Sequence, residues 1–241
     1  GCASLYTVYC GHTEKAWASV VIEDGNESFV DAQKFFANPS GECGENLTWE
    51  LDGGELTISG TGDMTQWAHE SERPWHEYSE EITKVVVSDG VTSVGSFAFK
   101  ALANVTNVEI ASTVAVIGAA AFAECGNLEE ITIPNGVETI DDGAFFESGI
   151  SEFAIPASVT YIGEGAFENC QNLTSIIVDS ENMSYSSDEY GVLFDKDMAT
   201  LVYCPLNAAI TTYSIPDTVF AINQKHLQET KILSALQFLA E

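Results

Sequence analysis

The chain repeats one short phrase at a nearly fixed interval. Four phenylalanines, each preceded by alanine, lie 23, 23 and 22 residues apart: Phe99, Phe122, Phe145 and Phe167. A valine lies eight residues before each phenylalanine, at Val91, Val114, Val137 and Val159. An interval of this length is typical of solenoids, in which each copy buries its apolar residues only by stacking on its neighbours. The period therefore predicts stacked coils with one continuous column of buried phenylalanines.

Each copy also carries a short alternating apolar stretch. The alternating pairs are Val85/Val87, Val108/Ile110, Ile131/Ile133, Phe153/Ile155 and Ile176/Val178. A period of two predicts a β-strand. Pro134, Pro156 and Pro216 follow three of the strand positions and cannot donate to a β-ladder, so they are expected to end it. We therefore expect a β-rich α/β solenoid, built as a leucine-rich repeat array with repeats of 22–23 residues.

One position of the repeat is occupied by Gly95, Gly118, Asp141 and Gly163, and by Asn223 in the last copy. Aspartate and asparagine are the non-glycine residues that best tolerate a positive φ. This pattern predicts a left-handed turn at the position.

Four segments are expected along the chain. Residues 1–36 are interpreted as the end of an upstream repeat array with a closing helix, because Cys2, Leu5, Val8 and Cys10 repeat the spacing of Cys125, Leu128, Ile131 and Ile133. Residues 37–41 form a linker rich in Pro, Gly and Ser. Residues 42–81 are interpreted as a β-hairpin cap module, because alternating stretches flank Asp52-Gly53-Gly54. The cap would cover the open edge of the first repeat.

Residues 82–241 are assigned to the leucine-rich repeats, with an inserted hairpin at about 179–209. Within it, "GVLFD" and "ATLVYC" flank a short polar turn. The strand positions then resume at Ile210, Tyr213 and Ile215, and Leu227 takes the place of the phenylalanine. Leu233, Leu236 and Phe238 continue the spacing to the end.

Charge excludes two classes of partner. Eight Lys and Arg against 37 Asp and Glu give a formal net charge of -29, which is unsuited to nucleic acid or to an anionic lipid surface. No run of 18 or more apolar residues occurs, so direct membrane insertion is not expected. A secretion signal and an anchor are expected outside this chain.

The sequence predicts neither a metal nor a cofactor, and no catalytic residue is assigned. The six cysteines lack CxxC spacing, the four histidines lack HExxH, and "DKDM" at 195–198 lacks ligands that a calcium loop needs.

Leu102, Cys125, Ser148 and Cys170 share one position, which favours small buried side chains. Cys125 and Cys170 would be about 10 Å apart, so we expect free thiols, since a disulfide needs Cα atoms within about 7 Å. A cysteine–histidine pair that meets only in space stays open.

The repeat unit "LEEITIPNGVETIDDGAFFES" resembles the BspA-like leucine-rich repeats of bacterial surface proteins. The block "GECGENLTWELDGGELTISGTGDM", followed by Pro74-Trp75, resembles the lead-in module of such proteins. The resemblance implies a secreted protein, extracellular or at the cell surface, that binds host proteins or other cells.

Outward-facing side chains of the strands should form columns on one face of the stack. One column reads Val86, Glu109, Thr132, Ala154 and Ile177, and its neighbour reads Lys84, Asn107, Glu130, Glu152 and Ser175. The candidate partner-binding residues are Val86, Glu109, Glu130, Thr132, Glu152 and Ile177, with the three glutamates steering a basic partner.

We therefore expect a non-catalytic binding or adhesion module, whose partner is a host matrix or cell-surface protein, or a glycan. The alternatives are a passive spacer in a larger secreted protein and a hydrolase. A spacer should have uniformly polar columns, whereas an adhesion module should carry apolar residues beside the acids. A hydrolase would need a nucleophile, a base and an orienting group in one pocket.

Overall fold

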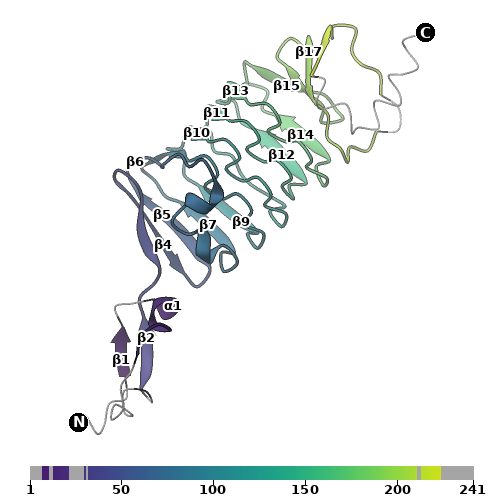
Figure 1. The fold of residues 1–241 in the computed structure, drawn as a ribbon. Helices are drawn as coiled ribbons and strands as arrows, with labels where there is room; N and C mark the ends of the chain where they lie inside the picture. Colours follow the sequence, from purple (N-terminus) through teal and green to yellow (C-terminus); the bar gives the residue numbers. More distant parts are fainter. Residues whose placement is uncertain (1–6, 11–12, 22–29, 31, 211–212, 224–241) are drawn as a thin grey trace.

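The structure is a computed structural model that describes residues 7–10, 13–21, 30, 32–210 and 213–223. Coils stack one behind another along the molecule, and short strands line two sides of the stack (Figure 1). The fold is a β-solenoid of leucine-rich repeats. Helix is scarce within the described residues: α1 spans Glu14–Trp17, and two 3-10 turns span Glu70–Glu72 (η1) and His76–Tyr78 (η2). The α/β character expected from the sequence is therefore not confirmed.

The first sheet begins with three antiparallel strands, β3 (Ser40–Gly44), β4 (Leu47–Asp52) and β5 (Glu55–Gly60). The two-residue turn between β4 and β5 is Gly53-Gly54, with φ of 55° and 90°, which suits the left-handed backbone of such hairpins. β5 then pairs in parallel with β7 (Lys84–Val87), and β7 with β9 (Asn107–Ile110). The hairpin of residues 47–60 therefore lies against the first edge of the repeats.

The sheet is interrupted after β9. The strand expected at Ile131 and Ile133 is not formed, although both side chains are buried, and the next pair is β12 (Glu152–Ile155) with β14 (Ser175–Val178). Within the described residues, no backbone hydrogen bond joins residues 130–133 to either neighbouring coil.

Proline accounts for the interruption. Where pairs form, the residue after the strand donates its N–H to the preceding coil: Ala111 to Val87 O at 3.0 Å and Asp179 to Ile155 O at 2.9 Å. Pro134 and Pro156 occupy this position in two successive copies and have no N–H to donate. The coil between β9 and β12 therefore lacks the last backbone hydrogen bond of the strand pairing on both of its sides.

A second sheet lines the other side of the stack. It contains β6 (Gly62–Asp63), β8 (Val91–Val94), β10 (Val116–Ile117), β11 (Thr139–Ile140) and β13 (Tyr161–Ile162), in that spatial order. The pairing is parallel throughout, and it is in register from β8 to β13, whereas the register shifts between β6 and β8. Val94, Ile117 and Ile140 are thereby buried at the same level of the core, and Ile162 packs against them partly buried.

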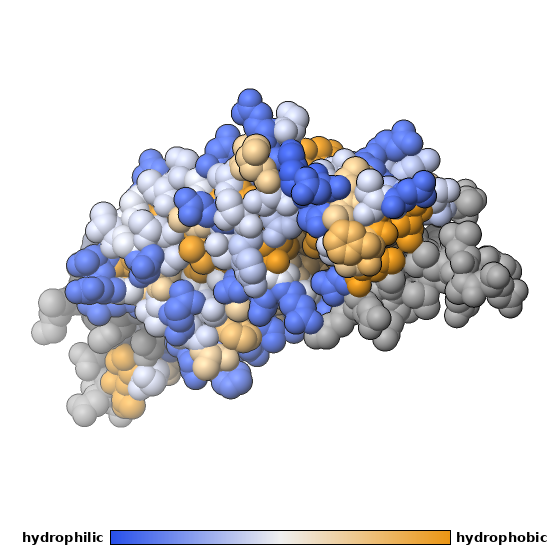
Figure 2. Space-filling view, turned by 90° about the horizontal axis from the view of Figure 1, so that it is seen from above, coloured by the Kyte–Doolittle hydropathy of each residue, from blue (hydrophilic) through white to orange (hydrophobic). Residues whose placement is uncertain are grey.

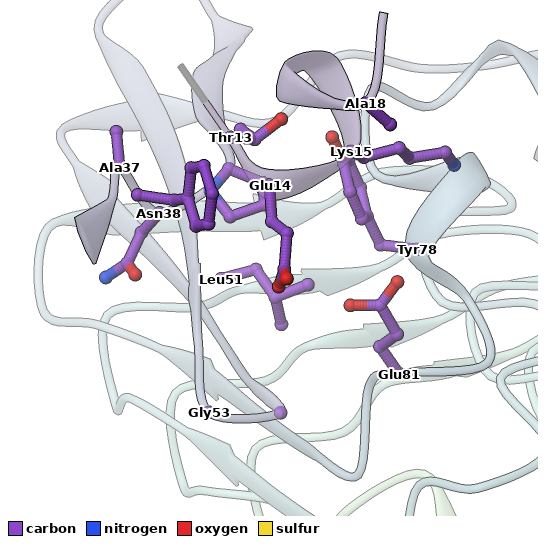
Figure 3. A pocket seen from close by; sticks show the side chains of 13 residues that line it. Thr13, Glu14, Lys15, Ala18, Ala37, Asn38, Leu51, Gly53, Tyr78 and Glu81 are labelled. Atoms are coloured by element: carbon purple, nitrogen blue, oxygen red, sulfur yellow. The ribbon is translucent and has the colours of Figure 1, made fainter. Parts of the chain in front are cut away.

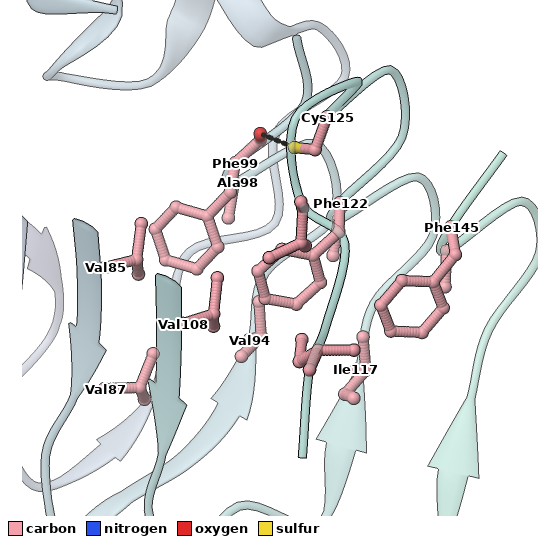
Figure 4. Packing of buried hydrophobic residues seen from close by; sticks show 14 of the residues in the cluster. Val85, Val87, Val94, Ala98, Phe99, Val108, Ile117, Phe122, Cys125 and Phe145 are labelled. Carbon is pink, nitrogen blue, oxygen red and sulfur yellow. Dashed lines mark hydrogen bonds between the residues drawn. The ribbon is translucent and has the colours of Figure 1, made fainter. Parts of the chain in front are cut away.

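The predicted phenylalanine column is confirmed. Phe99, Phe122 and Phe145 are fully buried and Phe167 is 2% exposed. Successive rings are stacked, with centroids 5.3, 5.6 and 6.0 Å apart, and Figure 4 shows the first three of them. The column is longer than predicted, because Trp75 stacks on Phe99 at 5.8 Å and Tyr203 contacts Phe167 at 5.9 Å.

The prediction for the glycine position is wrong. Gly95, Gly118, Asp141 and Gly163 do not have positive φ; the left-handed residues lie two positions later, at Phe97, Ala120, Gly143 and Gly165. Gly95 and Gly118 lie at the earlier position where their coils approach closely. A Cβ on Gly95 would lie 2.0 Å from Thr65 O, and one on Gly118 would lie 2.7 Å from Ser96 N. In these copies the constraint is space between coils and not the backbone angle, whereas one copy accommodates Asp141 at the same position.

The cysteine prediction is confirmed. Cys125 and Cys170 are free and fully buried, and their Sγ atoms donate to Phe99 O at 3.1 Å (Figure 4) and to Phe145 O at 3.0 Å. Leu102 and Ser148, at the same position of other copies, are buried as well.

Residues 179–210 add an antiparallel element to the stack. β15 (Tyr185–Ser187), β16 (Leu193–Asp195) and β17 (Thr200–Tyr203) pair in antiparallel order, and β18 (Ala221–Ile222) pairs in parallel with β17. Asn223 N donates to Leu201 O, as Asp141 N donates to Ile117 O and Gly163 N to Ile140 O in regular coils. β17 therefore takes the place of a preceding coil for the last described repeat.

The N-terminal segment contains β1 (Thr7–Cys10) and β2 (Gln33–Phe36), which pair in parallel. α1 begins after Thr13, and Trp17 N donates to Thr13 O at 2.9 Å. None of the helices in the described part of the chain is long and apolar enough to cross a membrane. The expectations for Cys2, Leu5, Leu227, Leu233, Leu236 and Phe238 lie outside the described residues.

Candidate functional site

On either side of the interrupted coil, the outward columns have the register that the sequence predicts. Lys84 lies opposite Asn107 and Val86 opposite Glu109, while Glu152 lies opposite Ser175 and Ala154 opposite Ile177. The core-facing residues alternate with them, because successive side chains of a strand point to opposite sides. We call the surface formed by these columns the strand face.

A shallow groove of about 320 Å³ lies on the strand face at the interrupted coil. Its lining residues come from four successive coils: Asn107, Val108, Glu130, Ile131, Thr132, Glu152, Phe153, Ala154 and Ile177. Four of the six candidate residues therefore line one hollow, namely Glu130, Thr132, Glu152 and Ile177. Val86 and Glu109 are on the same face but do not line this groove.

The groove combines exposed apolar side chains, which we call its apolar floor, with exposed acidic ones. The apolar floor consists of Ala154 and Ile177, and the acids are Glu130 and Glu152. Val108, Ile131 and Phe153 face the core and are almost fully buried. Such a surface can desolvate apolar atoms of a partner and attract its positive charge at the same time.

Glu109 differs from the other two glutamates. Its Oε1 lies 2.8 Å from Lys84 Nζ, which also lies 3.0 Å from Glu55 Oε2. Hydrogen bonds to Glu109 and Glu55 raise the pKa of the Lys84 ammonium above its ordinary value. The charge of Glu109 is therefore compensated within the protein. No ion pair is formed by Glu130 or Glu152 within the described residues, so an electrostatic role of the face rests on these two.

Apolar side chains lie beside the acids at the C-terminal end of the strand face. Ile177 is 56% exposed and Tyr190 is 44% exposed. Tyr190 was not among the candidates; it lies near β14 because Gly191 O accepts a hydrogen bond from Ile176 N at 3.1 Å. Figure 2 shows a different view of the molecule, in which hydrophilic residues are spread over the surface and hydrophobic ones gather near the C-terminal end.

A larger hollow, of about 710 Å³, lies between the N-terminal segment and the β4–β5 hairpin. The side chains of Glu14 and Glu81 extend into it (Figure 3). Lys15 joins its two sides, because its Nζ lies 2.8 Å from Glu77 Oε2 and 5.1 Å from the centre of the Tyr78 ring. Both members of this ion pair are more than half exposed, so the hollow is an open seam between two segments.

Other sequence features have structural roles. Arg73, the only arginine of the chain, is 2% exposed and donates to Phe97 O and Ser79 Oγ, so its guanidinium is unavailable to an anionic ligand. Trp75 is fully buried and donates through Nε1 to Ala98 O at 2.9 Å. Asp195 of the "DKDM" segment accepts from the backbone N–H groups of Ala199 and Thr200 and closes a turn.

The buried thiols of Cys125 and Cys170 are poorly suited to nucleophilic chemistry. Burial raises the pKa of the Cys125 thiol to about 12 and that of the Cys170 thiol to about 11, so both are protonated at neutral pH. The part of the chain that the structure describes contains no group of three or more His, Cys, Asp or Glu side chains placed to hold a metal ion.

Comparison with known proteins gives one family match. Residues 75–190 match the family described as the BspA type leucine rich repeat region, in six copies. A search of curated proteins gives no match.

Three solved bacterial structures are similar to this chain. A leucine-rich repeat protein from Eubacterium ventriosum is 29% identical, with a TM-score of 0.65, over 77% of this chain and 56% of that chain. The pneumococcal vaccine antigen PcpA is 14% identical, with a TM-score of 0.53, over 77% of this chain and 61% of that chain. A leucine rich cell surface protein from Faecalibacterium prausnitzii is 21% identical, with a TM-score of 0.45, over 74% of this chain and 65% of that chain. The chain thus spans less than two thirds of the length of each of these proteins.

Proposed function

Because residues 75–190 belong to the BspA-type leucine-rich repeat family, we propose that this solenoid is a non-catalytic protein-interaction module that binds its partner on the strand face. Solenoids use extended faces of stacked repeats to hold partners. The groove over the interrupted coil supports this use, because it is the place on the strand face where apolar atoms and free carboxylates meet.

The groove favours binding over a passive spacer role. A spacer needs only a solvated outer face, and uniformly polar columns would serve it. Here Ile177 is more than half exposed beside Glu152 and Ala154. An exposed apolar side chain beside carboxylates gives a partner a surface from which water can be displaced, which a uniformly polar face does not offer.

We further propose that the module acts in adhesion, at the bacterial cell surface or outside the cell. Proteins of the BspA-type family are usually surface or secreted proteins, which supports this location. The partner would be a host matrix or cell-surface protein, with a glycan as the alternative. The charge of -29 favours a partner with basic surface.

The test is to measure binding of the purified protein to a panel of defined matrix proteins and glycans, and then to fill the groove. Ala154→Trp places a large side chain in the groove from an exposed position. We expect it to weaken binding by at least about tenfold, because a bulky residue at the centre of an interface excludes the partner. Glu138→Trp is the matched control, since Glu138 is exposed and precedes β11 of the other sheet. Equal binding by the two variants would contradict the strand-face assignment.

A further inference from the structure

We propose that Glu130 and Glu152 bind the ammonium group of a lysine side chain in an extended segment of the partner, with the lysine stem lying on the apolar floor of the groove. This inference rests on the proposed function, because it assigns a partner chemistry to the same face. It is supported by an ammonium group that two carboxylates already bind on this face, that of Lys84.

The protein already binds an ammonium group between two carboxylates on this face. Lys84 Nζ lies between Glu55 Oε2 and Glu109 Oε1, at 3.0 and 2.8 Å, and the two glutamates belong to the strands on either side of β7. Glutamates on this face can therefore reach across neighbouring coils and share one cation. Lys84 is the internal template for the proposed contact.

Glu130 and Glu152 lie on adjacent coils with no lysine near them in the column, whereas Glu55 and Glu109 lie on either side of the strand that carries Lys84. Glu130 and Glu152 occupy the same column in successive coils, whose backbones are about 4.8 Å apart in a solenoid. Their neighbours in the column are Asn107 and Ser175, neither of which carries a charge. Two adjacent carboxylates without a counter-charge repel each other, and a cation placed between them relieves the repulsion. An ammonium group fits this place because it is compact and has three donors.

The floor of the groove matches the rest of a lysine side chain. Ala154 and Ile177 line the hollow beside the two glutamates, and both are exposed. A lysine stem consists of four methylene groups that cover apolar surface while the charged end stays at the polar rim. A small cation without a stem would leave this floor uncovered, so the combination favours a lysine side chain over an inorganic ion.

The interrupted coil favours an extended partner segment. Residues 130–133 have no backbone hydrogen bond to either neighbouring coil within the described residues, so their peptide groups are left to water or to a ligand. An extended segment can offer its own peptide groups there, and it presents alternate side chains to one surface.

The experiment uses a labelled peptide, acetyl-Val-Lys-Val-Lys-Val-amide, and the same peptide with acetyllysine in place of both lysines. Acetylation keeps the stem and removes the charge. Binding is measured by fluorescence anisotropy at low and at high salt. We expect the lysine peptide to bind more tightly than the acetyllysine peptide, and its binding to weaken with salt.

The decisive variant is the double change Glu130→Gln with Glu152→Gln, which keeps the shape of both side chains. We expect it to weaken binding of the lysine peptide by at least about tenfold. The control is Glu45→Gln with Glu138→Gln, which changes the net charge equally at two exposed positions away from the groove and should bind like the parent protein.

Three results would overturn the proposal. The first is equal loss of binding in the two double variants, which would mean general attraction to an acidic protein. The second is equal binding of the two peptides, which would remove the ammonium from recognition. The third is no binding of the lysine peptide even at low salt. None of these decides the proposed function, because Ala154→Trp tests the strand face with whole partners.

Discussion

At the scale of single residues, each phenylalanine of the column fills the space between two neighbouring rings. The ring planes of Phe122 and Phe145 differ by 6°, and those of Phe145 and Phe167 by 5°. The coils beside Phe122 are joined by the second sheet and by backbone hydrogen bonds such as Phe122 N to Ala144 O at 2.8 Å, so the surroundings cannot collapse easily when a ring is removed. A lost ring therefore leaves a cavity, and the cost includes the cavity as well as the lost burial.

Phe122→Ala should lower the free energy of unfolding by about 3 to 5 kcal/mol, as expected for removal of a fully buried ring. The measurement is chemical denaturation of the purified protein. Phe220→Ala is the matched control, because Phe220 is 85% exposed, and it should change stability by less than about 0.5 kcal/mol. If both variants lost similar stability, the column would not be the centre of the core.

The sequence predicts the buried residues better than it predicts the backbone. The phenylalanine and cysteine positions follow from period and side-chain size, and both are confirmed. The glycine position was assigned to a left-handed turn, but Gly95 is required by the approach of Thr65 O. Sequence cannot separate these causes, because a positive φ and a close contact both select glycine. Ala120 and Phe97, which do have positive φ, give no signal at all.

At the scale of elements, the strand alternation correctly predicts β7, β9, β12 and β14. It is wrong at Ile131 and Ile133, and also after the hairpin, where Tyr213 and Ile215 do not form the expected strand. The sequence does contain a signal for the interruption after β9, because Pro134 and Pro156 follow the strand in successive copies. One such proline removes one backbone hydrogen bond between two coils. Two in successive copies remove a backbone hydrogen bond on both sides of the same coil. Alternation reports only which residues face the core, and Ile131 and Ile133 still do.

Replacing both Pro134 and Pro156 by alanine should restore the ladder across residues 130–133. The new N–H groups can donate to the preceding coil as those of Ala111 and Asp179 do. Amide hydrogen exchange measured by NMR should then show slower exchange at Ile131 and Ile133, because hydrogen-bonded amides are protected.

Pro74→Ala is the control for this double change, since Pro74 is exposed and lies outside the sheets. It should leave exchange at Ile131 and Ile133 unaltered. Unchanged exchange in the double variant would mean that proline is not the cause of the interruption. The double variant should also bind the lysine peptide more weakly if open peptide groups contribute to the groove.

The hairpin at 179–210 shows a further limit of repeat-based prediction. Its strands were expected, but not that β17 would take the position of a coil and receive the hydrogen bond of Asn223. An antiparallel strand has no residue pattern in common with the repeat, so no alignment of copies can reveal the substitution. The same holds for the groove: the columns follow from the period, whereas the hollow depends on a missing strand.

At the scale of the whole molecule, charge acts against compactness. The chain carries 37 acidic residues and 8 basic ones. Lys84 and Lys100 each contact two glutamates, but these contacts engage only four acids. The remaining carboxylates are spread over a stack of narrow coils, so like charges on neighbouring coils lie within about one Debye length, which is about 10 Å at 0.1 M salt. Net repulsion of this kind destabilises the folded state.

The melting temperature should therefore rise when sodium chloride is increased from low to physiological concentration. Screening weakens repulsion among many exposed carboxylates and also weakens the few lysine pairs, but the repulsive contacts are more numerous. The measurement is thermal unfolding followed by circular dichroism at several salt concentrations. The combined variant Glu45→Gln, Glu130→Gln, Glu138→Gln and Glu152→Gln should start from a higher melting temperature at low salt and respond less to added salt. A melting temperature that falls with salt would contradict this prediction. It would mean that the ion pairs of Lys84 and Lys100 stabilise the folded state by more than the repulsion among carboxylates destabilises it, although these pairs are partly exposed.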